Sequence, residues 1–373
     1  MTQNPFGEMF GDIFSLLGRQ GPDAWYQAAQ QLAVSVARGE DGDPNPSPVE
    51  RPRLEEFAPL VARHVATLLG TDLDPSLEVS NRTALSLAAL AQWRPLLEPL
   101  VGASGSVPAL PDGDEAALVA QMASTLGPLL TGFQTGSIAG HFSERAWSLA
   151  ALPLPRADGR HLIVLNNLTA FADAWSLGHD EVFVFALAQE LVASRVLTQS
   201  GTGDALRALL LDAAGEARAV QGDILGRLQS LADGGDLAAL MNDPSSLLEG
   251  LEVPDDSPAT RAINAATAVL AAYFNAVAQS VTETLLGPRP ALAEAVLRHR
   301  LSDARGEDAA AALFGISQQG PHVDEAARFV ATLAAAHGLE VFGALLRVDG
   351  LATDAELREP EAWLERVTSS PLA

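Results

Sequence analysis

The sequence contains no cysteine and no lysine. Without cysteine the chain can form no disulfide and no thiolate metal site, and it has no thiol nucleophile. Each of its 23 basic residues is an arginine, so it also lacks the lysine that forms a Schiff base in pyridoxal enzymes and the lysine that binds phosphate in P-loop proteins. These absences exclude several large classes of enzyme, and the lack of cysteine fits a reducing compartment.

Positive charge is scarce as well. The 23 arginines stand against 47 acidic residues, which gives a formal net charge of -24. Such a chain repels the phosphate backbone of nucleic acids and the anionic headgroups of lipids. We therefore expect neither nucleic acid nor a membrane among its partners.

No leader or membrane span is readable. The apolar stretch Phe6–Leu17 is interrupted by Glu8 and Asp12 and follows no basic region, so no signal peptide is predicted and a cytoplasmic location is expected. No charged residue lies between Arg261 and Glu283, but this stretch is rich in alanine and contains several amide and hydroxyl side chains. A buried core helix is favoured there over a membrane span.

Helical periodicity dominates the chain, of which 48% is hydrophobic and able to form a continuous core. The best strand candidate is His161–Leu165, and Leu77–Val79 is either a strand or a loop. The predicted class is α+β, predominantly α-helical, with one small sheet. We divide the chain into an N-terminal helical region (1–115), a core (116–300) and a C-terminal helical region (301–373) packed on that core in one compact unit. Helices are predicted at 23–38, 54–69, 83–100, 115–130, 180–200, 202–231, the uncharged stretch after 261, 290–300, 324–337, 339–346 and 359–368.

Three glycines recur at four-residue spacing in the segment 132–147: Gly132, Gly136 and Gly140. On a helix this spacing places them on one face, where the missing side chains permit a close approach of another helix. We interpret them as packing residues rather than as a ligand-binding loop.

The predicted helix 180–200 is apolar on all sides, which is typical of a central, buried helix. It contains one acidic residue in its apolar middle, Glu190. Burying an unpaired carboxylate is costly, so Glu190 is the most informative local anomaly in the sequence.

Short motifs along nearly the whole chain, taken in their order and spacing, carry a resemblance to a known family. They are 5–7, 21–25, 93–99, 136–156, 162–167, 171–172, 175–176, 180–182 and 359–364. Together they resemble the bacterial zincin-like family of hydrolases and zinc-dependent metalloproteases. The resemblance implies a zincin-like core in which the helix 180–200 is the active-site helix.

Members of that family carry a His-Glu-x-x-His motif on this helix, in which two histidines ligate zinc and the glutamate is the general base. Carried over by position, the ligands fall on Gln189 and Ala193, and the general base falls on Glu190. The family's third ligand, an acidic residue on a later helix, aligns with Ala271. Neither an amide nor a methyl group replaces an imidazole on zinc. We therefore expect no zinc cofactor in this chain, and we interpret Glu190 as a remnant of the general base.

Two interpretations of Glu190 are open. In the first, an arginine or backbone N–H donors satisfy the carboxylate inside the former cleft. In the second, Glu190 survives as a catalytic acid. The first is favoured, because without a metal ion there is no activated water for Glu190 to deprotonate.

Three histidines of the matched region are candidates for a replacement metal site: His141, His161 and His179. They stand on different predicted elements and share no ligand spacing, so ordinary, partly exposed histidines are favoured. His179 precedes Asp180 and Glu181, and its simpler role is at the entry of the helix, where acids complement the helix dipole.

The leading hypothesis is a catalytically inactive zincin-like protein that binds a peptide or protein. Asn166, Asn167 and His179 are its cleft candidates, although turn formation is the favoured role for the asparagine pair. The alternative is an active metal-dependent hydrolase or peptidase with other ligands, drawn from His179, Glu181 and Glu190 with water. A third possibility is a structural or assembly protein that retains only the fold.

Overall fold

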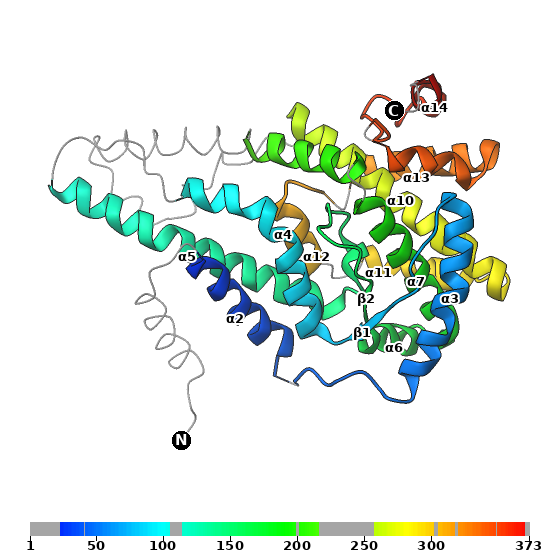
Figure 1. Cartoon of the computed structure of the whole chain (residues 1–373), viewed down its shortest axis with the longest axis horizontal. Coiled ribbons are helices and arrows are strands. Elements are labelled where there is room, and N and C mark those ends of the chain that lie inside the picture. The colour runs from blue at the N-terminus through cyan, green and yellow to red at the C-terminus, as the bar shows by residue number, and fades with distance from the viewer. Residues whose placement is uncertain are drawn as a thin grey trace.

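The structure is a computed structural model that describes residues 23–40, 42–104, 114–198, 201–215, 257–301, 305–317, 320–347 and 349–369. In this part of the chain helices surround one short sheet (Figure 1). The fold is α+β and predominantly α-helical, which confirms the predicted class. The helices are α2 (Ala24–Arg38), α3 (Glu50–Leu69), α4 (Arg82–Ser104), α5 (Asp114–Arg145), α6 (Leu165–Ala174), α7 (His179–Leu197), α10 (Pro258–Leu286), α11 (Pro290–Leu301), α12 (Arg305–Leu313), α13 (Pro321–His337) and α14 (Pro360–Ser369), with the short 3-10 helices η1 (Leu149–Ala151) and η3 (Leu339–Leu346) and a further helix at 201–215.

The sheet consists of two parallel strands, β1 (Glu78–Ser80) and β2 (Leu162–Val164). Val79 is paired with Ile163, and β2 is fully buried. On the side of β2 away from this pairing, the N–H of Val164 donates to the carbonyl of Trp147 at 2.8 Å. Both segments considered as strands are therefore strands, and β2 positions the chain at Trp147.

Helix α7 is the central helix of the molecule. Its side chains are buried over nearly the whole length, between α3 and α10 (Figure 1). Such a helix has no solvent-facing side on which a charged residue could be placed cheaply. The predicted central and buried position is confirmed, and Glu190 lies in its middle with no exposed surface.

The three spaced glycines lie on α5, where α2 crosses closely alongside (Figure 1). A Cβ atom at Gly136 would lie 2.8 Å from the Cα of Ala29, and one at Gly140 would lie 2.5 Å from the Cβ of Val36. A Cβ at Gly132 would meet the backbone of Trp25. The two helices approach closely because these Cβ atoms are missing, so the predicted packing role is confirmed.

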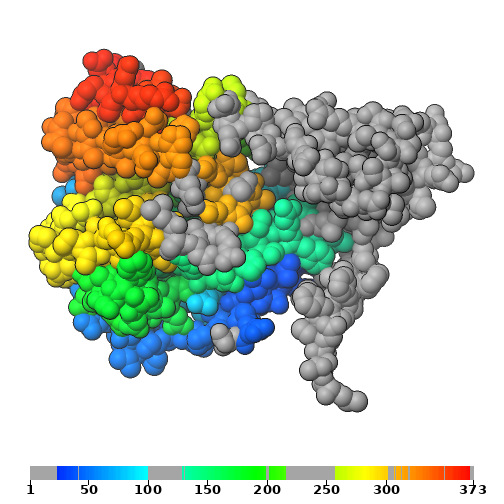
Figure 2. Space-filling view, turned by 180° about the vertical axis from the view of Figure 1, so that it is seen from behind, coloured from blue at the N-terminus to red at the C-terminus, as the bar shows by residue number. Residues whose placement is uncertain are grey.

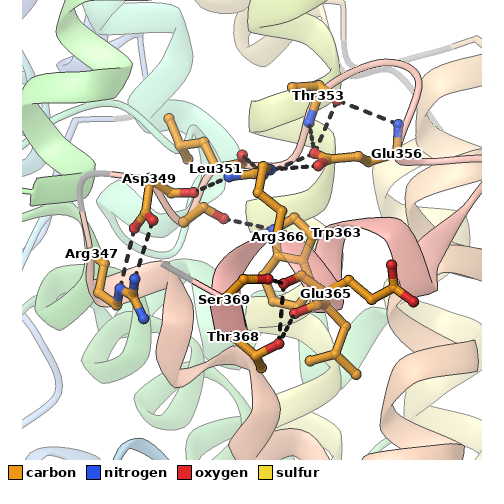
Figure 3. Close-up of polar contacts among 12 residues, drawn as sticks. Arg347, Asp349, Leu351, Thr353, Glu356, Trp363, Glu365, Arg366, Thr368 and Ser369 are labelled. Atoms are coloured by element: carbon orange, nitrogen blue, oxygen red, sulfur yellow. Dashed lines mark hydrogen bonds and ion pairs between the residues drawn. The ribbon is translucent and has the colours of Figure 1, made fainter. Parts of the chain in front are cut away.

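Hydrogen bonds from one arginine connect the C-terminal helix α14 to the loop that precedes it (Figure 3). Arg366 donates to the carboxylate of Glu356 through Nε at 2.6 Å and through Nη2 at 2.9 Å, and Nη2 also donates to the carbonyl of Leu351 at 3.0 Å. The indole of Trp363 donates to the carbonyl of Gly350 at 2.9 Å. These contacts, with the burial of Trp363, hold α14 in place beside α13.

Some predicted boundaries differ from the structure. Segment 339–346, predicted as a helix, is a 3-10 helix rather than an α-helix. The predicted helix 202–231 is seen at 201–215, and its remainder lies outside the described residues. The first predicted division, after residue 115, falls in the first turn of α5, and the division into three regions stays a prediction.

The stretch weighed as a membrane span belongs to α10, whose inner face is buried in the core. Within the described ranges no single helix is long and apolar enough to cross a membrane. The consecutive helices α13 and η3, taken together, have the length and apolar composition of a membrane span, but they are bent by 116° relative to each other.

Adding a methyl group at the crossing of α2 and α5 tests the packing role of the glycines. We expect Gly136→Ala to lower the free energy of unfolding by about 1–3 kcal/mol, because the new Cβ overpacks the crossing. Gly215→Ala is the matched control, since a Cβ there meets no atom of the described residues within 4 Å, and it should stabilise by up to about 1 kcal/mol. Urea unfolding measures both; a Gly136→Ala protein as stable as wild type contradicts the packing role.

Candidate functional site

Glu190 forms a buried ion pair with Arg156. The guanidinium donates through Nη1 to Oε1 at 2.6 Å and through Nη2 to Oε2 at 3.0 Å, so the pair is bidentate. The two side chains are 2% and 0% exposed. The backbone N–H of Ala150 also donates to Oε2, at 3.2 Å. Both carboxylate oxygens thus accept hydrogen bonds, from an arginine and from a backbone N–H. These are the partners expected in the favoured interpretation of Glu190.

Backbone contacts hold Arg156 in position. Its N–H donates to the carbonyl of Leu197 at the end of α7, at 3.1 Å. The next residue, Ala157, donates its N–H to the side chain of Gln92 on α4, at 2.5 Å. The segment from η1 to Arg156 therefore lies along α7 and delivers the guanidinium to the only described acidic residue in the interior of that helix.

The two positions that carry zinc-binding histidines in the resembled family are occupied by groups that are not used as zinc ligands. The amide Nε2 of Gln189 donates to Oδ1 of Asn275 on α10, at 2.8 Å. Ala193 is fully buried and offers a methyl group. Ala271, at the position where the resemblance expects the third ligand, also lacks a donor atom. These side chains do not fit a zinc ion, because zinc sites in proteins are built from imidazole, thiolate or carboxylate ligands.

A small pocket of about 50 Å³ lies beside the ion pair. Its walls come from most of the segment 145–151, from Gln189 of α7, from Ala271 of α10, and from α11. Two of the three positions at which the resemblance expects a metal ligand, Gln189 and Ala271, thus line one pocket, whereas Ala193 is not among its lining residues. Seen from the back, the surface of α11, drawn in yellow, adjoins the green surface around α6 (Figure 2).

His299 of α11 lines the pocket and accepts a hydrogen bond from Arg145. Nη2 of Arg145 lies 2.9 Å from its Nδ1 and 2.8 Å from its carbonyl oxygen. A guanidinium only donates, so Nδ1 must accept and the hydrogen of the neutral ring resides on Nε2. Burial, and secondarily the charge of Arg145, lowers the pKa of His299 from 6.5 to about 4. At neutral pH the ring is uncharged, and neither nitrogen offers a metal ion a lone pair without rearrangement.

Aromatic contacts fix the plane of this ring. His299 stacks on Trp147 at a centroid distance of 5.5 Å and an interplanar angle of 16°, and the edge of Phe171 lies against it at 4.9 Å. Trp147 is held in turn by the backbone of β2. Trp147 and His299, which line the pocket, are therefore held by contacts with each other, with Phe171 of α6 and with β2.

The three histidine candidates lie apart, each with its own partner. Nδ1 of His141 is 3.1 Å from Glu144, and Nδ1 of His161 is 3.0 Å from the carbonyl of Ser76. His179 stands at the start of α7, as expected. No group of three or more His, Asp or Glu side chains that could hold a metal ion is found among the described residues.

The entry of α7 is a network of its own. His179 contacts Asp173 through Nε2 at 3.1 Å and Glu50 through Nδ1 at 3.5 Å, and mainly the hydrogen bond to Asp173 raises its pKa above the usual value. Glu181 accepts from the N–H of Gly178 at 2.8 Å, which caps the helix. The structure does not bring His179 or Glu181 to the pocket.

The asparagine pair begins α6 rather than forming a turn, because the helix starts directly after β2. Asn167 is buried; its amide donates to the carbonyls of Ser143 and Ala146 at 3.0 and 2.8 Å. Asn166 donates to the carbonyl of Pro44 at 2.8 Å. Neither lines the pocket, so a role in binding a partner stays a prediction.

Sequence reasoning missed Arg156 and the wall of Arg145, His299 and Arg300. For Arg156 a signal exists, because a buried glutamate in a chain without lysine requires an arginine or a backbone donor. No comparable signal marks His299, whose neighbours in sequence are exposed or half-buried residues of α11.

Comparison with known proteins gives two matches. A sequence model for the family described as zincin-like metallopeptidase matches residues 25–364. A solved structure from Chloroflexus aurantiacus, described as a "putative hydrolase with a novel fold", superposes with a TM-score of 0.61 at 17% identity, covering 92% of this chain and 98% of the other. At this identity the second match shows a shared fold alone. No curated protein matches significantly.

Proposed function

The chain belongs to the zincin-like metallopeptidase family, and we propose that it is a catalytically inactive member that binds a peptide or protein partner at the former metal cleft. The observation that carries this proposal is the state of Glu190. A general base must reach a water molecule within hydrogen-bond distance. Both oxygens of Glu190 are instead engaged by Arg156 and Ala150, in a side chain with no exposed surface.

The chemistry of the neighbouring positions supports the same proposal. In a zinc peptidase the ion lowers the pKa of its bound water from about 15.7 to about 7, and this change makes the nucleophile. The amide of Gln189, which is hydrogen-bonded to Asn275, and the buried methyl group of Ala193 supply no ligand for that ion. We derive no hydrolytic step from these residues, and no zinc cofactor is proposed.

Binding rather than chemistry is the role that the site supports best. The pocket remains open between α7, α10 and α11 although its ligands are replaced, and it is lined by polar groups with fixed orientations. A net charge of -24 disfavours nucleic acid and anionic membranes as partners. We propose a peptide or protein partner in the cytoplasm, the location that the absence of cysteine favours.

The enzyme alternative keeps metal-dependent hydrolysis and replaces the ligands. Its ligand candidates are His179, Glu181 and Glu190. Glu181 pairs with Arg289 at 3.0 Å, and Glu190 pairs with Arg156. These contacts would have to break before the three groups could share an ion. A purely structural role is the third proposal. A specific binding partner for the pocket would support the binding proposal over the purely structural one.

Zinc uptake distinguishes the proposal from the enzyme alternative. After incubation with excess zinc and desalting, we expect wild type to retain well under one equivalent of zinc by atomic emission. The double variant Gln189→His with Ala193→His should retain more, because an i, i+4 histidine pair faces one metal. Thermal unfolding of the double variant checks that it folds despite the larger side chain at the buried position 193. One equivalent of zinc in wild type contradicts the proposal.

Turnover is the second test. With excess zinc, wild type should hydrolyse a mixture of fluorogenic peptides no faster than its Glu190→Gln variant. Glu294→Gln, at an exposed position of α11, is the matched control for carboxylate loss. Hydrolysis by wild type and by the control that disappears in a Glu190→Gln protein shown to be folded by thermal unfolding would establish Glu190 as a catalytic residue and overturn the inactive assignment.

A further inference from the structure

His179, at the start of α7, lies between two acidic side chains from different helices. Its Nε2 is 3.1 Å from Oδ1 of Asp173 in the last turn of α6, and its Nδ1 is 3.5 Å from Oε2 of Glu50 in the first turn of α3. The side chains of His179 and Glu50 are 27% and 26% exposed. Oε2 of Glu50 is buried and has no hydrogen-bond partner among the described residues, so its contact with the ring is ionic. One imidazole thus joins three helices.

The two contacts favour the protonated ring. An ionised carboxylate only accepts hydrogen bonds, whereas a neutral imidazole carries a hydrogen on one nitrogen and a lone pair on the other. If the hydrogen of a neutral ring were on Nε2, where Asp173 accepts it, the lone pair of Nδ1 would face the buried oxygen of Glu50. The other tautomer would place a lone pair against Asp173. Protonation removes this repulsion, because both nitrogens of an imidazolium carry a hydrogen.

The neighbouring charged groups at this end of α7 have partners of their own. Asp180 pairs with Arg53 of α3 at 2.5 Å, and Glu181 pairs with Arg289, which directly precedes α11, at 3.0 Å. Arg53 also attracts Glu50 through its charge, but its guanidinium is hydrogen-bonded to Asp180. The carboxylate of Glu50 therefore depends on the imidazole for its closest positive charge.

Opposing effects act on the protonation of His179. The positive end of the α7 dipole disfavours a cation at this position. The hydrogen bond to Asp173 is the largest effect on the pKa of His179; burial opposes it and Glu50 adds to it, so that the pKa is raised above 6.5. The three side chains do not amount to a metal site, since no group suited to a metal ion is found in the described ranges. Their arrangement instead stabilises a positive ring.

We propose that His179 forms a pH-sensitive bridge, whose protonated ring holds the first turn of α3 and the last turn of α6 against the start of α7. Below pH 6.5 the ring is protonated in both the folded and the unfolded chain, and its contribution to stability is fully present. As the pH rises through the raised pKa of the folded protein, the ring loses its proton and the contribution is lost. His179, Asp173 and Glu50 do not line the pocket, so the bridge is independent of the proposed binding role.

Urea unfolding of the full chain between about pH 5.5 and about pH 8.5 tests the bridge. The measured quantity is the unfolding constant of His179→Gln divided by that of wild type. This ratio should be about fivefold larger at the acidic end than at the alkaline end, as expected for two partly exposed ion pairs. His141→Gln is the matched control, because His141 pairs with Glu144 of its own helix. Its ratio to wild type should stay within about twofold over the same range.

The ring signals of the histidines in the full chain labelled with ¹⁵N measure the protonation itself, and the signal absent from His179→Gln identifies the bridging ring. In wild type this signal should titrate above pH 6.5. Glu50→Gln and Asp173→Asn should each lower the midpoint, because each removes one of the two negative charges. A midpoint at or below 6.5, a midpoint that Glu50→Gln leaves unchanged, or an unfolding ratio for His179→Gln that is constant with pH overturns the proposal.

Discussion

The buried ion pair between Arg156 and Glu190 is the interaction around which the candidate site is organised. Either charge alone in this interior would cost several kcal/mol, so each requires the other. The pair also fixes the chain that carries it. Ala150 donates to Glu190 and the N–H of Arg156 donates to Leu197, so the segment 150–156 is attached along α7 at several points. That segment continues into the wall of the pocket, whose shape therefore depends on the pair.

The fold follows from local patterns to a large extent. The apolar composition of 180–200 predicts a central helix, and the glycine spacing on α5 predicts close packing, because both can be read from residues close together in the sequence. The pattern around 339–346 predicts a helix but does not distinguish 3-10 from α geometry, which the packing of η3 against α13 decides. Glu190 is recognisable as an anomaly, but its partner lies 34 residues away and cannot be identified by any helical period.

The pocket is less predictable than the fold, because it is assembled from distant segments. Arg145 and His299 are 154 residues apart, and only their tertiary contact reveals the tautomer and the lowered pKa of the histidine. The resemblance indicates where a metal would be expected, and Gln189 and Ala193 at those positions are not zinc ligands. At the helix position where the resemblance expects a histidine, Gln189 presents an amide that donates to Asn275. The family fold is kept, while Gln189 and Ala193 offer no ligand suited to zinc, which is consistent with function residing in the site rather than in the fold.

The central claim is that Glu190 serves the structure through Arg156, and a double-mutant cycle on their stability tests it most directly. Urea unfolding of wild type, Arg156→Met, Glu190→Gln and the double variant gives the coupling free energy. We predict that each single variant loses about 3–5 kcal/mol, since each leaves a buried charge unpaired, and that the double variant loses much less than the sum. A Glu190→Gln protein as stable as wild type, with additive effects in the double variant, would contradict the account and return Glu190 to the catalytic residues.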